Sequence, residues 1–166
     1  MKHFARRLKV NDNINTDYVI SGRYKFKIQD PKELAGHIFE DIDPGFAARI
    51  KEGDILIAGD NFGCGSSREQ APQALKMAGF SAVVAKNFAR IFYRNAFNIG
   101  LLVVECNTDF IDDGDELEID AVSGKIQNKS KGLLLDIKPV PPVMKKLLED
   151  GGVVEHFKKY GGFKFE

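Results

Sequence analysis

The sequence predicts an α/β fold in which helices flank a central, mostly parallel sheet. The first observation behind this prediction is that short apolar runs, which suit buried strands, alternate with segments of helical spacing. In chain order these are a strand at 55–58, a helix at 66–79, a strand at 82–85, a helix at 87–98 and a strand at 101–104. Such alternation favours a parallel sheet with right-handed crossovers.

The second observation lies in the last third of the chain. The turn signal Ser123-Gly124 is flanked by 116–120 and 125–128, which predicts a C-terminal hairpin. Residues 133–137 suit a further strand, and 143–150 suit a helix with prolines before its start and glycines beyond its end. We find no linker that would split the chain, so residues 1–166 are expected to form a single domain.

The first 50 residues are less regular. Residues 18–20 suit a short strand. Residues 23–30 alternate charged and apolar side chains, which is typical of either an edge strand or a loop. One short helix fits between Pro44 and Gly53. These segments are therefore expected to lie around the sheet and to contribute little to it.

Composition excludes several classes of function. The 166 residues are 43% hydrophobic and 29% charged, which is typical of a globular protein. The 24 basic and 24 acidic side chains cancel, so bulk charge favours neither a nucleic-acid partner nor a membrane surface. No apolar stretch reaches the roughly 18 residues of a membrane span. The basic segment 1–7 lacks the apolar region of a signal peptide, so a cytoplasmic location is expected.

The chain offers few ligands for a metal. Its two cysteines, Cys64 and Cys106, cannot complete a four-cysteine zinc or iron–sulfur site within one chain. Neither do they resemble the disulfide framework of a secreted domain. The three histidines, His3, His37 and His156, have no metal-ligand spacing. We therefore expect no metal site within this chain.

The segment 60–72 has the strongest chemical pattern, because it joins a predicted strand to a predicted helix through a glycine-rich loop. Proline suits the first turn of a helix, so Pro72 places Ser66, Ser67 and Arg68 at or just before the helix N-terminus. Free backbone N–H groups and the helix dipole attract anions there. The Arg68 guanidinium adds a planar fork suited to a carboxylate. The local pattern predicts a carboxylate or phosphate pocket that contains two hydroxyl groups.

A simpler interpretation is helix capping. Ser66 with Glu69, and Ser67 with Gln70, both fit a capping box. The glycine spacing is not that of a dinucleotide-binding loop, and neither a Walker A loop nor a nucleophile elbow is present. From the local pattern alone, capping and anion binding both stay open, and one serine can serve both purposes.

Four ordered stretches resemble one known family. Residues 60–69 (DNFGCGSSRE) are similar to the signature of the aconitase superfamily's swivelling domain. Short free-standing versions of that domain are the small subunits of isopropylmalate dehydratase and homoaconitase. The stretches 12–17, 53–59 and 87–95 resemble the same small-subunit pattern, in the same order. The resemblance extends from about residue 5 to about residue 155.

The resemblance implies a swivelling β/β/α domain that works as the small subunit of a hydro-lyase. Such an enzyme interconverts 2-isopropylmalate and 3-isopropylmalate in leucine biosynthesis by dehydration and rehydration. It implies a four-iron, four-sulfur cluster on a large subunit, with no cofactor bound by this chain. It also implies that Ser66 is the catalytic base, while Ser67 and Arg68 bind a substrate carboxylate. Alone, such a chain is expected to be inactive, and it can self-associate.

Substrate choice is expected to depend on the loop after the first motif. Homoaconitase-type subunits resemble Tyr-Leu-Arg there, and isopropylmalate-type subunits have an apolar residue in place of the arginine. This chain has Phe26 at that position, which favours an apolar substrate group. Lysines flank Phe26, so a shift of one residue would present a charge instead. The alternative is that Tyr24, Phe26 and Ile28 are core-facing strand residues.

Other hypotheses stay open at this stage. Homoaconitase and dimethylmalate-type dehydratase are the nearest enzyme alternatives, and an anion-binding regulatory module without catalysis is the alternative of another class. Arg90 and Arg94, four residues apart on a predicted helix, either line an interface or cleft or lie on a solvated face. The acidic segment 112–116 lacks the pattern of an EF-hand and is expected to be a solvated turn.

Overall fold

The apolar runs of the central region form the parallel half of a seven-stranded sheet. In the computed structural model, which describes residues 1–66 and 68–165, the strand order is β4-β3-β2-β1-β5-β6-β7. The strands are β1 (His3–Arg7), β2 (Ile55–Ile57), β3 (Ala82–Ala85), β4 (Leu102–Glu105), β5 (Glu116–Asp120), β6 (Lys125–Asn128) and β7 (Leu133–Asp136). Strands β1 to β4 pair in parallel, and β5 to β7 pair antiparallel. The predicted parallel sheet and hairpin are therefore confirmed.

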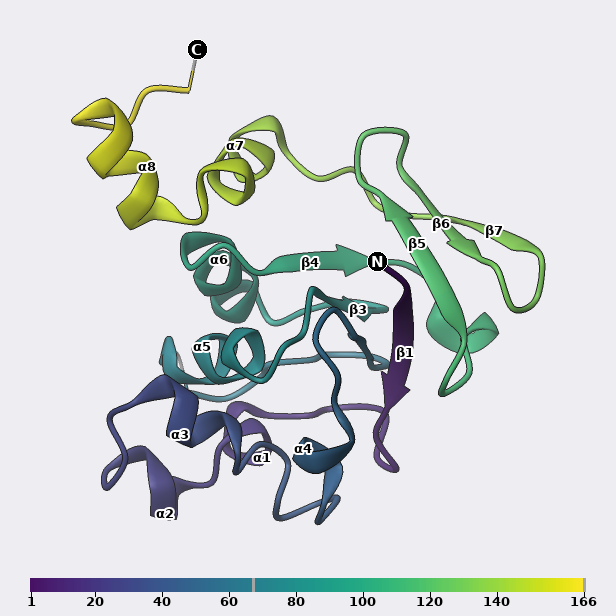
Figure 1. Cartoon of the computed structure of the whole chain (residues 1–166), viewed down its shortest axis with the longest axis horizontal. Helices are drawn as coiled ribbons and strands as arrows, with labels where there is room; N and C mark the ends of the chain where they lie inside the picture. Colours follow the sequence, from purple (N-terminus) through teal and green to yellow (C-terminus); the bar gives the residue numbers. More distant parts are fainter. Residues whose placement is uncertain (67, 166) are drawn as a thin grey trace.

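The helices lie on one side of the parallel part of this sheet. Their bounds are α1 (Thr16–Val19), α2 (Gly22–Lys25), α3 (Pro31–Ala35), α4 (Phe46–Arg49), α5 (Gln70–Met77), α6 (Arg90–Asn98), α7 (Pro142–Asp150) and α8 (Val153–Tyr160), with a 3₁₀ turn η1 (Thr108–Phe110). Figure 1 shows α1 to α6 gathered on the side of the sheet away from β5, β6 and β7. None of the helices in the described part is long and apolar enough to cross a membrane.

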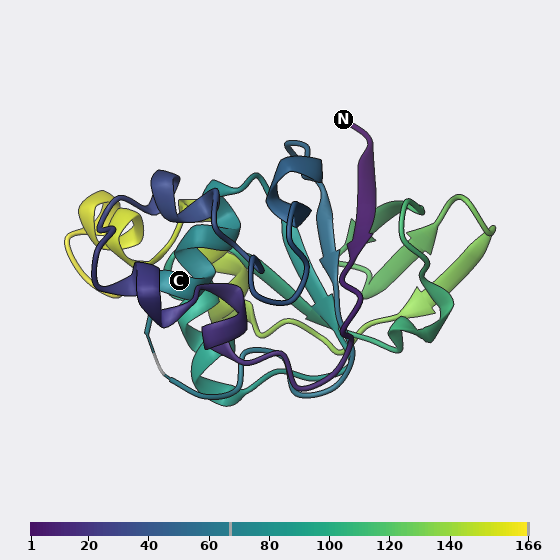
Figure 2. The same cartoon turned by 90° about the horizontal axis from the view of Figure 1, so that it is seen from below.

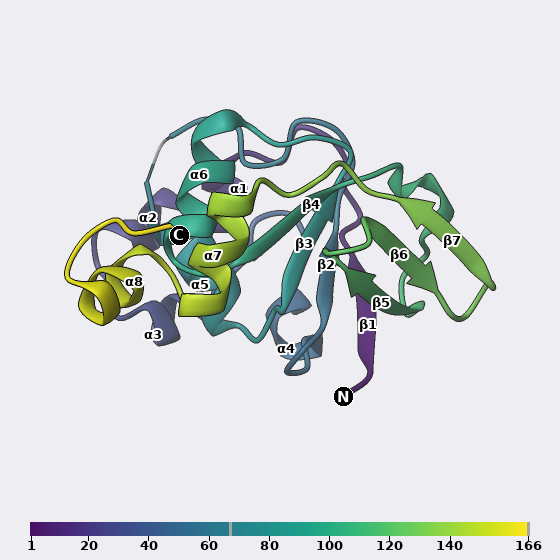
Figure 3. The same ribbon diagram turned by 90° about the horizontal axis from the view of Figure 1, so that it is seen from above.

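Two cores form because successive strand residues point to opposite faces of the sheet. Leu56 and Val83 pack under the helices, while their neighbours Ile55 and Val84 pack on the other face. That other face is covered by β5, β6 and β7, which curl across it and bring Ile126 into contact with it. Figure 3 shows α5, α6 and α7 on one side of β3 and β4, and the antiparallel strands on the other.

Backbone contacts join the chain just after β4 to the chain just after β7, the two edge strands of the sheet. The Lys138 N–H donates to the Glu105 carbonyl over 2.9 Å, and Cys106 pairs with Ile137 in an antiparallel bridge. Glu105 ends β4, while Ile137 and Lys138 follow β7. The sheet thus curls back on itself, and the ends of its two edge strands meet through these hydrogen bonds.

The predicted strand at 18–20 is wrong, and of the two alternatives for 23–30 the edge strand is wrong. Asn15 caps α1 by accepting a hydrogen bond from the Tyr18 N–H over 2.9 Å, which favours a helical turn. Residues 22–25 form α2, and the Ile28 N–H donates to the Tyr24 carbonyl over 2.9 Å. Hydrogen bonds within the segment thus satisfy its backbone where the alternating pattern predicts a sheet edge.

Two predicted helices begin later than expected, for a shared reason. Helix α5 begins at Gln70, because the Ser66 carbonyl accepts a hydrogen bond from the Thr16 hydroxyl over 3.1 Å. A helix that started at Ser66 would use that carbonyl for the Gln70 N–H. Helix α6 begins at Arg90, because the Asn87 carbonyl accepts from the Phe62 N–H over 3.1 Å. In both cases, contacts between distant segments override the helical pattern.

Candidate functional site

The segment from Phe62 to Ser66 lies between two other stretches of backbone. On one side is the chain before α1. There the Gly63 N–H donates to the Ile14 carbonyl over 2.8 Å, and the Thr16 N–H donates to the Cys64 carbonyl over 2.9 Å. Figure 2 shows these two segments running side by side from the end of the sheet toward α1. The stretch 12–17 thus supports the stretch 60–69.

On the other side is the chain before α6. Phe62 exchanges two backbone hydrogen bonds with it, donating to Asn87 over 3.1 Å and accepting from Ala89 over 2.9 Å. The Phe62 ring is fully buried and meets the Phe88 and Phe92 rings edge-on. The segments that resemble one family in sequence therefore meet in space at the start of the loop.

Polar side chains tie the same three segments together. The Asp60 N–H donates to the Asp12 carboxylate over 2.8 Å, and the Asn61 N–H donates to Asn87 Oδ1 over 2.7 Å. Asn87 in turn donates to the Asp60 carboxylate over 2.7 Å, and Asn61 donates to Asn13 Oδ1 over 3.1 Å. Asparagine and aspartate suit this role, because their short side chains bond to nearby backbone. The network fixes the entry of the loop.

Glycine is required where the loop crosses α6. Gly63 has φ of +79°, and a Cβ atom there would lie 2.3 Å from the Phe92 ring. No other residue fits both the backbone angle and the space. Phe92 thus sets how closely the loop approaches α6, and therefore the path of the chain toward Ser66.

Ser66 lies exposed at the end of this supported segment. Its main chain is held through its carbonyl by Thr16, whose side chain is buried. The capping interpretation is wrong for Ser66, because the N-cap of α5 is Glu69 and makes no side-chain capping bond. Ser67 lies outside the described residues. The sequence therefore places Ser66 correctly near the start of α5, but on a loop before the helix.

Arg68 and Phe26 meet, although 42 positions separate them in the chain. The Arg68 guanidinium carbon lies 4.8 Å from the centre of the Phe26 ring, a cation–π contact. Both side chains are exposed, and Phe26 is 74% exposed. The interpretation of Phe26 as a core-facing strand residue is therefore wrong. Tyr24 and Ile28 do pack partly against the core, four positions apart on the other face of this segment.

The side chain before Phe26 points the other way. Lys25 is buried and forms an ion pair with Asp17, the last residue of the first family-like stretch. The Lys25 carbonyl accepts a hydrogen bond from Gln70 Nε2 over 3.1 Å, which ties α2 to the first residue of α5. The structure therefore presents an aromatic ring, and not the Lys25 ammonium group, beside Arg68.

Sequence reasoning did not single out these supporting residues. Thr16, Asp17 and Lys25 have no pattern of their own that indicates a site. The available signal was that Thr16 and Asp17 belong to the stretch 12–17, which recurs with the loop in the family-like pattern. A buried lysine and a loop-supporting threonine become visible only when the segments are folded together.

A second set of polar side chains, Tyr24, His37 and Glu40, anchors α2 away from Phe26. The Tyr24 ring stacks on His37 with centroids 4.0 Å apart, and His37 Nδ1 lies 3.0 Å from the Glu40 carboxylate. A hydrogen bond to Glu40 raises the pKa of Tyr24, and the same bond lowers the pKa of Glu40. Tyr24 is thus held protonated as a donor to Glu40, which fixes α2 from behind while Phe26 faces outward.

The chain's own residues do not fit an iron–sulfur cluster. Cys64 is half-buried, and Cys106 is buried on the far core, where burial raises the pKa of its thiol to about 11. Among the described residues, no three histidine, cysteine or acidic side chains gather in a way that could hold a metal ion. Two cysteines are too few for the ligand set of such a cluster.

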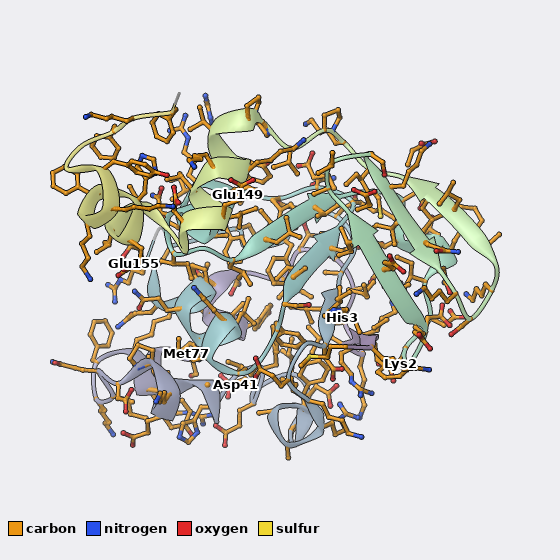
Figure 4. All side chains as sticks on the ribbon, turned by 45° about the horizontal axis from the view of Figure 1, so that its top comes forward. Lys2, His3, Asp41, Met77, Glu149 and Glu155 are labelled. Carbon is orange, nitrogen blue, oxygen red and sulfur yellow. The ribbon has the colours of Figure 1, made fainter. Side chains whose placement is uncertain are left out.

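The three histidines lie apart, as predicted. Figure 4 places His3 at the start of β1, on the opposite side of the molecule from Glu155 of α8. His3 Nδ1 lies 2.6 Å from the Gly53 carbonyl, and His156 is buried in α8 against Asp150 at 2.7 Å. Each histidine has a local packing or hydrogen-bonding role.

The chain is similar to known proteins over most of its length. Residues 7–109 match the model of the aconitase C-terminal domain. The chain is 52% identical over 164 residues to 3-isopropylmalate dehydratase small subunit 2 of Archaeoglobus fulgidus, covering 99% of both chains. It is 51% identical to the 3-isopropylmalate dehydratase small subunit of Halothermothrix orenii, with the same coverage. The crystal structure of 3-isopropylmalate dehydratase from Methanocaldococcus jannaschii superposes with a TM-score of 0.91 at 44% identity, covering 96% of this chain and 94% of that one.

Proposed function

Because the chain belongs to the 3-isopropylmalate dehydratase small subunits of the aconitase superfamily, we propose that it supplies half of a hydro-lyase active site. The reaction interconverts 2-isopropylmalate and 3-isopropylmalate in leucine biosynthesis, with the cytoplasm as its predicted location. The observation that supports this most directly is the convergence of the segments around 12–17, 60–69 and 87–95 on one exposed loop. The whole of 1–166 acts as one swivelling domain in this proposal.

Ser66 is the proposed base. In its alkoxide form, its oxygen accepts a proton from the substrate carbon next to the one that loses hydroxide, which leaves an alkene and a neutral serine. On rehydration the serine returns that proton to the carbon that lost hydroxide, and hydroxide adds to the other carbon. A serine hydroxyl is a weak base, so nearby positive charge must stabilise its alkoxide. Arg68, two residues further along the chain, supplies a guanidinium on the same exposed surface. Thr16 positions Ser66 by holding its carbonyl.

Arg68 and Phe26 are the proposed substrate contacts. A guanidinium suits a carboxylate, and the contact with Phe26 uses the face of the Arg68 guanidinium, which leaves its N–H edge without a partner among the described residues. Phe26 offers an apolar surface next to it, which suits the isopropyl group of the substrate. Ser67, the remaining predicted substrate contact, stays a prediction. The same apolar surface fits a dimethylmalate-type substrate, whereas the extra carboxylate of a homocitrate-type acid has no cation at position 26.

The site needs a second surface to work. Ser66, Arg68 and Phe26 all lie open to solvent, and proton abstraction from carbon benefits from the exclusion of water. We propose that the large subunit covers them and brings the iron–sulfur cluster, for which this chain lacks the cysteines. Alone, the chain is then inactive.

The decisive experiment compares two serine variants in the assembled enzyme. The chain is purified anaerobically with its large subunit, and turnover is measured on isopropylmalate, dimethylmalate and homocitrate-type acids. Ser66→Ala is expected to leave the complex intact and to lower turnover about 10²–10⁴-fold, since a positioned proton acceptor is lost. Ser123→Ala, on the exposed hairpin turn, is the matched control and keeps normal turnover. Near-normal turnover of Ser66→Ala would rule out this base.

A further inference from the structure

Arg90 and Arg94 lie exposed on one face of α6 without a partner in the part of the chain that the structure describes. The other arginines away from the loop have hydrogen-bond or ion-pair partners within the chain. Three of them pair with an aspartate each, and Arg7 donates to two backbone carbonyls and to Asn11. Two positions four residues apart on a helix are neighbours, so the two guanidiniums lie on the same face of α6.

These arginines border an apolar hollow of about 350 Å³ between α6 and the segment that leads into α7. Its apolar walls include Phe88, Tyr93 and Met144. The acid in this hollow, Glu105, is already paired with Lys138 at 2.9 Å. The hollow therefore combines apolar walls with two positive charges that are not balanced locally.

The hollow is also in contact with the start of the loop that carries Ser66. Ala89, the residue before Arg90, donates its N–H to the Phe62 carbonyl over 2.9 Å, and Phe62 begins the segment that ends at Ser66. The Phe88 side chain that lines the hollow packs edge-on against Phe62. A partner that covers Ser66 across this loop would next meet the Arg90 face of α6.

We propose that this hollow, with Arg90 and Arg94, docks an acidic segment of the large subunit. Carboxylates of that segment pair with the two guanidiniums, and an apolar side chain between them enters the space beside Phe88 and Met144. Charge complementarity favours this occupant, because buried arginines without acids destabilise an interface while arginine–carboxylate pairs form bidentate contacts. The zero net charge of the chain disfavours a nucleic acid as the partner. This inference rests on the proposed function.

The test measures assembly and catalysis separately. The dissociation constant between the chain and its anaerobically purified large subunit is determined, and turnover is measured with the small subunit in excess. Arg90→Glu/Arg94→Glu is expected to weaken assembly at least tenfold, while turnover of the saturated complex changes little. Arg90→Gln/Arg94→Gln is expected to weaken assembly less, and to make the dissociation constant less dependent on salt concentration.

The matched control reverses two exposed lysines elsewhere, Lys32→Glu/Lys164→Glu, which gives the same change in net charge. Equal affinity of the control and the arginine variant would overturn the docking site. Lower turnover at unchanged affinity would do so too, because the arginines would then act on substrate. Ser66→Ala distinguishes the two proposals, since it is expected to bind the large subunit normally and to lose turnover. Failure of the wild-type chain to bind a large subunit would overturn both proposals.

Discussion

At the scale of single residues, the character of the surface beside Arg68 depends on which side chain follows Lys25. Phe26 presents its ring to the Arg68 guanidinium at 4.8 Å, while the ammonium group one position earlier is buried. One residue therefore sets whether the surface beside Arg68 is apolar or cationic. Under the proposed function, a difference at this position is expected to change the class of substrate without changing the fold.

Replacing this ring with a cation should change substrate preference. Phe26→Arg, in the assembled enzyme, is expected to raise kcat/KM for a homocitrate-type tricarboxylate relative to isopropylmalate by about 10- to 100-fold. The reason is that a charge-assisted contact to the third carboxylate contributes about 1.5–3 kcal/mol. Phe110→Arg, at another exposed phenylalanine on η1, is the control and should leave the ratio unchanged. An unchanged ratio for Phe26→Arg would remove this residue from specificity.

At the scale of elements, two four-residue helices, α1 and α2, hold the proposed substrate-facing surface around Phe26 in place. Helices this short are unstable alone, so they depend on contacts with other segments. Lys25 of α2 pairs with Asp17 of α1, and its carbonyl is bonded to Gln70 of α5. The pair has one buried member, Lys25, and one exposed member, Asp17. The position of Phe26 follows from these two tethers.

Removing only the acid of this pair, Asp17, should destabilise the folded protein more than removing only the base, Lys25. Asp17→Asn leaves a buried ammonium group without its partner and is expected to lower the free energy of unfolding by about 1–2 kcal/mol. Lys25→Met removes the charge and is expected to be nearly neutral. The double variant should regain most of the loss. Urea unfolding of the four proteins checks this order, and a larger loss for Lys25→Met than for Asp17→Asn would contradict it.

At the scale of the whole molecule, the sheet curls so that its outer strands share backbone contacts. Cys106, just after β4, pairs with Ile137, just after β7, and its thiol is buried in the core between them. Burial raises the pKa of this thiol from an ordinary 9.0 to about 11. The thiol is therefore neutral in the folded protein at a pH where it ionises in the unfolded chain.

This difference makes stability depend on pH in the alkaline range. Because the folded pKa lies above the unfolded one, the folded state binds more protons, and stability falls as pH rises from about 9 to about 11. The contribution of Cys106 to that fall is about 2 kcal/mol. Cys106→Ala and Cys106→Ser should both show a shallower decline than wild type in urea unfolding between pH 8 and pH 11. Parallel curves for wild type and both variants would show that Cys106 is not responsible.

Much of the molecule follows from local pattern. The apolar runs at 55–58, 82–85 and 101–104 are too short and too apolar for surface helices, and they form β2, β3 and β4 within a residue of the expected bounds. The hairpin around Ser123-Gly124 also forms where the turn residues predict it. Buried parallel strands and tight turns are encoded by neighbouring residues, which explains why sequence alone determines them.

Helix starts and the segment around Phe26 were decided by contacts between distant residues. Ser66 has a capping pattern, but Thr16 holds its carbonyl and delays α5 to Gln70. Residues 23–30 alternate like a strand, but local turns and the Lys25 tethers make a short helix. The contacts of Thr16 with Ser66 and of Lys25 with Gln70 join residues 50 and 45 positions apart, so no local pattern contains them.

The sequence by itself determined the chain's α/β architecture, its membership of a family by four ordered stretches, and the identity of Ser66, Arg68 and Phe26 as candidates. Only the tertiary structure decided that Arg68 and Phe26 touch, that Lys25 turns inward, and that Arg90 and Arg94 lie beside an apolar hollow with no partner in residues 1–66 and 68–165. The physical reason is that motifs specify which groups are present, whereas packing and charge pairing between separate segments specify which groups face each other and which stay exposed.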